Sequence, residues 1–182
     1  MENAIGMLEV TSVARGIYTA DQMVKISEVD IVTAASACPG KYIVIVHGDA
    51  ASVEASMKRG EETAGTFLVD SIIIPNVSPQ VFPAVVGAEM PEEIGAVGIV
   101  ESFSMATMLM SADAILKSAH VEAIELRLGN GLGGKAYFTF TGDVAAVETG
   151  VRAAKELADG DSLLVNTEVV PSPSDKLIQL LL

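Results

Sequence analysis

The stretch from Ala4 to Asp30, AIGMLEVTSVARGIYTADQMVKISEVD, decides the fold because it occurs a second time in the chain. The segment from Ala96 to Glu122, AVGIVESFSMATMLMSADAILKSAHVE, aligns with it without a gap. The identical pairs include Gly6 and Gly98, Glu9 and Glu101, Ser12 and Ser104, Ala20 and Ala112, Asp21 and Asp113, Lys25 and Lys117, and Val29 and Val121. A period of about ninety residues is too long for a solenoid and suits a small domain. We therefore predict a tandem duplication.

The repeat continues toward the end of each copy. After a two-residue insertion in the second copy, GKYIVIVHGDAASVEA (from Gly40) aligns with GKAYFTFTGDVAAVET (from Gly134). Each copy then ends an apolar strand with proline, in IIIPNVSP and EVVPSPSD. We place the first domain at residues 1–86, the linker at 87–95 and the second domain at 96–182.

The first copy predicts the order of secondary structure for both. The chain begins with a predicted strand over 4–10, and a capping box at Thr19–Gln22 opens a helix that runs through Ile26. Two strands follow, over 29–36 and 41–48, and a Cys-Pro-Gly turn joins them. A helix over 50–64, capped by Asp49, and a strand over 67–75 complete the copy. The order β-α-β-β-α-β predicts the α+β class, with two ferredoxin-like sandwiches in which two helices cover one sheet face.

Composition restricts the partners. The chain has 182 residues, 24 acids against 11 bases and a formal net charge of −13, so no basic footprint for nucleic acid or an anionic membrane is expected. No apolar run reaches the roughly 18 residues that span a bilayer. The opening MENAIGMLEV carries an acid where a signal peptide carries basic residues. The single cysteine excludes an internal disulfide and fits a reducing cytoplasm.

One motif imitates a nucleotide site. In GNGLGGKA, Gly129, Gly134 and Lys135 match the spacing G-x-x-x-x-G-K of a phosphate-binding loop. Such a loop needs a helix N-terminus after it, whereas the following YFTFTG predicts a strand, and Ala136 stands where Ser or Thr is required. We interpret the segment as the second copy's hairpin loop.

No catalytic set is visible either. Glu9 and Glu101 lie inside apolar strands, but an acid repeated in both copies indicates a structural hydrogen bond more than catalysis. His47 and His120 are not equivalent in the repeat and have no Cys, Asp or Glu at metal-ligand spacing. We predict that the chain is not an enzyme.

Cys38 stands directly before Pro39 and Gly40, at the predicted hairpin turn. It is either a small buried apolar residue or, because turns lie at surfaces, a metal ligand or redox group at an exposed tip. The second copy has no cysteine at this place. The residues alone leave both readings open.

The repeated strands, the ADQMVK and SADAILK helices and the Gly-Lys after each hairpin resemble bacterial microcompartment shell domains over nearly the whole chain. The resemblance implies that three chains form a pseudohexamer that tiles into a shell in the cytoplasm, beside other shell proteins. It implies contacts between tile edges at Lys25 and Lys117, and a pore lined by Ala37, Pro39, Gly40, Asn130, Gly131 and Leu132. The arginine that usually accompanies these lysines is absent from PNVSP and PSPSD.

The CPGK turn resembles a branch of the family whose trimer holds an iron–sulfur cluster on its axis. This resemblance implies a homotrimer in which three copies of Cys38 ligate a 4Fe–4S cluster with a non-protein fourth ligand, for electron transfer or cluster delivery to encapsulated redox enzymes. Alternatives are a tile with an open metabolite pore and no metal, a zinc site in place of the cluster, or a soluble ligand-binding regulator built from the same domains.

Overall fold

The computed structural model describes residues 4–87, 91–158 and 163–181. Residues 1–3, 159–162 and 182 of the predicted domains and residues 88–90 of the predicted linker therefore lie outside its description. The chain divides into two compact units, Met1–Val77 and Ser78–Leu182.

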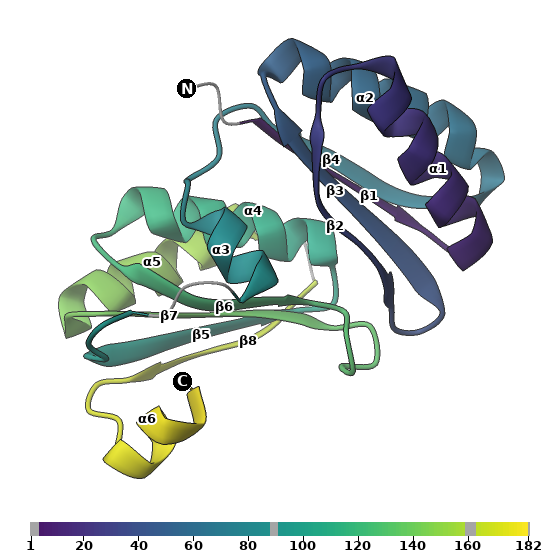
Figure 1. Ribbon diagram of the computed structural model, residues 1–182. Helices are drawn as coiled ribbons and strands as arrows, with labels where there is room; N and C mark the ends of the chain where they lie inside the picture. The colour runs from purple at the N-terminus through teal and green to yellow at the C-terminus, as the bar shows by residue number, and fades with distance from the viewer. Residues whose placement is uncertain (1–3, 88–90, 159–162, 182) are drawn as a thin grey trace. The chain divides into compact units, whose positions relative to one another are not determined.

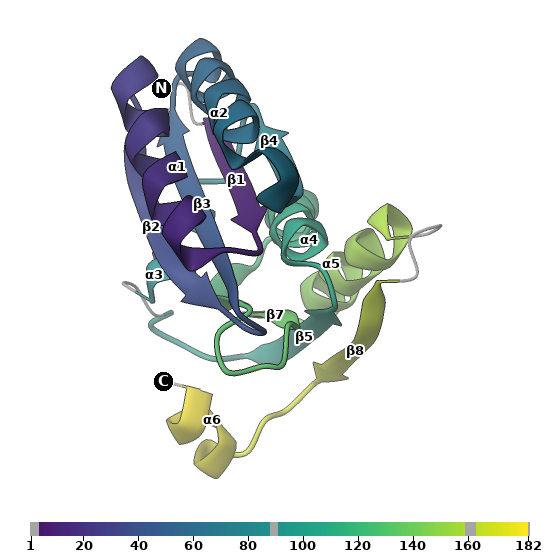
Figure 2. The same ribbon diagram turned by 90° about the vertical axis from the view of Figure 1, so that its right-hand side faces the viewer.

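The first unit is an antiparallel sheet with two helices on one face (Figure 1). Its strands follow the order β2-β3-β1-β4, with bounds β1 Ala4–Val10, β2 Asp30–Ala37, β3 Lys41–Gly48 and β4 Leu68–Ile74. The helices are α1 (Val13–Ile26) and α2 (Ala50–Ala64), which lie side by side, and a 3₁₀ turn, Gly65–Phe67, precedes β4 (Figure 2).

The second unit repeats this arrangement with strand order β6-β7-β5-β8. Its elements are β5 Ala96–Ser102, α4 Met105–Ser118, β6 Glu122–Leu128, β7 Ala136–Gly142, α5 Val144–Leu157 and β8 Leu164–Val170. A shift in strand register also recurs. It lies between Ile31 and Thr33 where β2 pairs with β3, and between Ala123 and Glu125 where β6 pairs with β7. The predicted α+β class and duplicated β-α-β-β-α-β order are confirmed.

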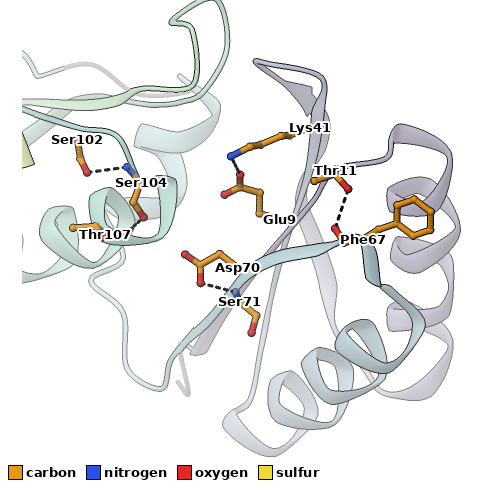
Figure 3. Close-up of polar contacts among 9 residues, drawn as sticks. All are labelled: Glu9, Thr11, Lys41, Phe67, Asp70, Ser71, Ser102, Ser104 and Thr107. Atoms are coloured by element: carbon orange, nitrogen blue, oxygen red, sulfur yellow. Dashed lines mark hydrogen bonds and ion pairs between the residues drawn. The ribbon is translucent and has the colours of Figure 1, made fainter. Parts of the chain in front are cut away.

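The start of the first helix differs from the prediction. Ser12 caps α1, with an extended backbone (φ −131°, ψ 120°) and a side chain that accepts a hydrogen bond from the Arg15 amide at 3.2 Å. Ser104 caps α4 in the same way, through the Thr107 amide at 3.0 Å (Figure 3). Thr19 is buried in the middle of α1, so the capping box predicted there is wrong.

Two short helices, α3 (Val81–Val86) and α6 (Asp175–Leu181), were not predicted. The Gln80 side chain before α3 donates to the Val121 carbonyl at 3.3 Å and accepts from the Ala123 amide at 2.9 Å, which joins α3 to the edge of β6. Residues 78–86, placed in the first domain from the sequence, therefore lie in the second compact unit.

The helix-facing sides of the two sheets are built on different residues. Leu8, Val44 and Met57 are fully buried in the core of the first unit, whereas Phe138 and Phe140 stack in the second with ring centroids 5.3 Å apart. Glycines on the central strands give these side chains room. A Cβ at Gly98 would overlap the Phe140 ring, and a Cβ at Gly6 would lie 2.6 Å from the Met57 side chain.

We expect Gly98→Ala to destabilise the protein by about 2 kcal/mol, and Gly6→Ala by less, because overpacking costs more where the neighbour is a rigid ring than where it is a flexible thioether. Urea unfolding of the two variants beside the unsubstituted protein measures the difference. Equal midpoint shifts would contradict this account of the two cores.

Candidate functional site

The β2–β3 hairpin ends at Cys38, Pro39 and Gly40. Ala37, the last residue of β2, is 5% exposed and pairs with Lys41 at the start of β3. Cys38 is half-buried, whereas Pro39 and Gly40 are exposed. The Cys38–Pro39 peptide bond is cis, and Gly40 has φ +72°, a conformation that favours glycine. The tip thus carries one thiol at the edge of the exposed turn.

An ion pair ties the base of this hairpin to the central strand. The Lys41 ammonium contacts Glu9 Oε1 of β1 (Figure 3). The Glu9 side chain is only 4% exposed and that of Lys41 is 26% exposed. Since Lys41 pairs with the residue preceding Cys38, this contact helps to hold the tip in place.

The second hairpin is built on glycine and has the same ion pair. Its loop runs from Gly129 to Lys135, and the Lys135 ammonium contacts Glu101 of β5. Asn130 and Gly131 are exposed and Leu132 is half-buried. The strand β7 begins at Ala136, so no helix follows the loop, as expected from the sequence, and the phosphate-loop reading has no structural support.

The two Glu–Lys pairs were missed at the level of sequence. The signal was present, because the acid inside the first strand and the lysine after the hairpin recur in both copies. Their pairing depends on β1 and β3 lying side by side, with Glu9 opposite Ile43. The expectation that the repeated acids have a structural role agrees with these contacts.

A cavity of about 480 Å³ lies on the face of the second sheet that α4 and α5 leave uncovered. Its lining includes Ile99 and Tyr137 from the sheet, Leu132 from the Gly129–Lys135 loop and Leu181 from α6. The Tyr137 hydroxyl donates to Glu125 Oε2 beside it. Burial first, and then this hydrogen bond to the carboxylate, raise the pKa of Tyr137 to about 12.

The raised pKa of Tyr137 predicts a pH effect. Because the folded protein holds the proton more tightly than a tyrosine of ordinary pKa, near 10, this contribution to stability is present below pH 10 and is lost as pH rises toward about 12. We expect Glu125→Gln to bring the tyrosinate absorbance transition of Tyr137 to lower pH, with Tyr137→Phe as the variant that identifies its signal. An unchanged transition would contradict the role of Glu125.

Lys25 and Lys117 occupy equivalent places in the last turns of α1 and α4. Each lies 2.6 Å from a carboxylate one turn earlier, Asp21 and Asp113, and their side chains are 65% and 44% exposed. The hydrogen bond from Lys25 lowers the pKa of Asp21. Both lysines lie at the surface, and their contacts between tiles remain a prediction.

Over the ranges 4–87, 91–158 and 163–181, no group of three or more His, Cys, Asp or Glu side chains is placed to hold a metal ion. His47 Nε2 lies 3.7 Å from Asp30 Oδ2. Within the described part of the chain, Cys38 is therefore the one candidate ligand for a metal centre at the hairpin tip. Among the same residues, no helix is long and apolar enough to cross a membrane.

The BMC domain family model matches residues 4–77 and 96–173. The chain is 37% identical over 177 residues to the bacterial microcompartment shell protein PduT of Citrobacter freundii, covering 97% of this chain and 96% of that protein. It is 27% identical over 189 residues to the carboxysome assembly protein CcmO of Synechococcus elongatus, covering 96% and 67%.

A crystal structure of a microcompartment protein from Desulfitobacterium hafniense superimposes with a TM-score of 0.95 at 44% identity, covering 98% of this chain and 99% of that one. Both halves of the chain thus match the family, and they do so with the duplicated fold described above. The chain belongs to the BMC domain family, as a tandem-domain bacterial microcompartment shell protein similar to PduT.

Proposed function

We propose that three copies of this chain form a pseudohexameric tile of a microcompartment shell in the cytoplasm, and that the tile holds a 4Fe–4S cluster on its threefold axis. The role is structural rather than catalytic, with other shell proteins as neighbours. The cluster transfers electrons across the shell or is delivered to encapsulated redox enzymes.

The position of Cys38 carries the proposal. The thiol lies at a hairpin tip between buried Ala37 and the exposed Pro39-Gly40 turn. A threefold axis at this tip would bring together three thiols, which no single chain can supply. The equivalent hairpin of the second unit has glycine and no cysteine, so its Gly129–Lys135 loop adds little bulk around such an axis.

The residues fit a cluster with three protein ligands. Cysteine thiolates are the usual ligands of 4Fe–4S clusters, which take four, so three copies of Cys38 would leave one iron for a non-protein ligand. When bound, the cluster supplies a one-electron redox centre. The chain's own contribution is to hold the thiol at the turn, through the Lys41–Glu9 contact at the hairpin base.

An exposed apolar face supports the association of copies. On α1, Val13 and Ile17 are 41% and 56% exposed. Their equivalents on α4, Met105 and Leu109, are 1% and 0% exposed. Apolar side chains that are buried in one copy of the repeat and exposed in the other indicate a surface that is covered on assembly.

Oxygen-free purification and reconstitution with iron and sulfide test the proposal. We expect about four iron and four sulfide per three chains, visible charge-transfer absorbance and a paramagnetic signal on reduction. Zinc found by elemental analysis would replace the cluster with a zinc site, and a colourless trimer would favour an open metabolite pore. Sizing at several concentrations separates the tile from a dimeric ligand-binding regulator.

A further inference from the structure

The two short helices α3 and α6 are a second, less obvious product of the duplication. PNVSPQVFPAV (from Pro75) follows β4, and PSPSDKLIQLL (from Pro171) follows β8. Ser78 and Ser174 open the same turn, because the Val81 amide donates to the Ser78 carbonyl at 3.0 Å and the Leu177 amide donates to the Ser174 carbonyl at 2.8 Å. The copies therefore share a local structure.

Their surroundings differ. On α3, Val81 and Ala84 are buried, and the helix contacts β6 and α4 within the second unit. The equivalent residues of α6 are Leu177 and Leu180, and no residue of Asp175–Leu181 is buried. Leu180 is 83% exposed. Leu177 is half-buried, so α6 leaves one leucine exposed and one partly exposed at positions that α3 buries. Such a helix is expected to have a docking surface elsewhere.

The place where α3 docks identifies, through the repeat, the equivalent place where α6 is expected to dock. It consists of a carboxylate on α4 and the edge strand β6: the Ser78 amide donates to Asp113 Oδ1 at 2.7 Å, and Gln80 bonds to Val121 and Ala123. The equivalent residues of the first unit are Asp21 on α1 and Val29 and Ile31 at the edge strand β2.

This equivalent surface is exposed. The Asp21 side chain is 47% exposed, against 10% for Asp113. The hydrogen bonds described for Asp21 are accepted by Oδ2, the oxygen that contacts Lys25, whereas the Ser78 amide binds the other carboxylate oxygen of Asp113. Ile31 is 44% exposed on the edge strand. Edge strands with exposed apolar residues are ready sites for further contacts.

We propose that α6 docks on the α1–β2 edge of a second copy of this chain, in the way that α3 docks on the α4–β6 edge. The Ser174 amide then donates to Asp21, and Leu177 and Leu180 are buried against Ile31 and its neighbours. Lys176 replaces Gln80 and can donate only, to the Val29 carbonyl. Its charge is complementary to Glu28 and Asp30 on either side of that residue.

This inference rests on the proposed association of copies and adds a specific contact to it. A contact from the second unit of one copy to the first unit of the next is head-to-tail, and it closes into a ring when the rotation between copies allows. Every copy would then both donate and receive one C-terminal helix.

Cross-linking with a short bis-maleimide tests the contact, in a Cys38→Ser background that leaves only introduced thiols. The test pair is Asp21→Cys with Ser174→Cys, and the control pair is Asp113→Cys with Ser78→Cys. We expect the control to link within one chain and the test pair to give covalent dimers and trimers on a denaturing gel. A test pair that stays at the mass of one chain, while the control links internally, overturns the proposal.

Sizing of the protein before cross-linking separates the two ideas. Trimers without cross-links between copies would refute the α6 contact and leave the tile intact, whereas a monomer at every concentration would refute the tile as well. In addition, we expect Leu180→Asp to raise the concentration needed for assembly at least tenfold, as expected for loss of a buried leucine. The exposed neighbour Gln179→Asp is the control, and equal effects of the two substitutions would contradict the docking.

Discussion

Cys38→Ser is expected to remove iron binding completely while the oligomer persists. A serine hydroxyl is nearly the size of the thiol but is a poor ligand for the iron of a cluster, and in the proposed trimer the substitution would remove three thiolates at once. Iron and sulfide analysis after oxygen-free reconstitution should fall from about four of each per three chains to background. Sizing of the same sample reports the assembly.

Two outcomes would contradict this expectation. Iron retained by the serine variant would mean that Cys38 is not the ligand. Loss of the oligomer together with the iron would mean that the metal centre holds the copies together, as structural metal sites do. Ser36→Ala, two residues earlier on β2 and exposed, is the matched control that should change neither measurement.

Lys41→Ala is expected to cost about 3 kcal/mol of folding stability, because it leaves the carboxylate of Glu9 buried and without its partner. The Glu9 side chain is 4% exposed, whereas that of Glu101 is 30% exposed. The equivalent substitution Lys135→Ala therefore costs only about 1 kcal/mol, since water can replace the lysine. Each of the two lysine variants therefore serves as the control for the other.

Urea unfolding of the two variants measures this difference. Adding Glu9→Gln to Lys41→Ala should recover most of the loss, because the uncompensated charge is then gone. Equal destabilisation in the two copies, or no recovery in the double variant, would contradict the importance of burial. The Lys41 variant should also retain the proposed cluster less well after reconstitution, since the hairpin base next to Cys38 is loosened.

Much of the fold could be predicted because the same sequence pattern occurs in both domains. Strand and helix patterns that are ambiguous in one copy become convincing when Gly6, Glu9 and Lys25 recur at equivalent places. The helix start was missed since Thr19 formed a plausible capping box, and the actual cap, Ser12, was visible only as a repeated serine. The short helix α3 contains Pro83, so its helical pattern is weak.

The candidate site could also be predicted only in part from the sequence. Cys38 could be placed at a turn from its Pro-Gly neighbours, and the hairpin confirms that place. The partners of Lys41 and Lys135 could not be assigned, because strand alternation tells which residues share a face and not which strands lie side by side.

The sequence by itself determined the duplication, the order of elements in each domain and the position of the lone thiol, because these depend on periodicity and on turn residues close together in the chain. Only the tertiary structure decided that Glu9 meets Lys41 and that Gln80 joins α3 to the edge of β6. These contacts link residues more than thirty positions apart. Their formation depends on the strand order of the folded sheets, which local preferences do not encode.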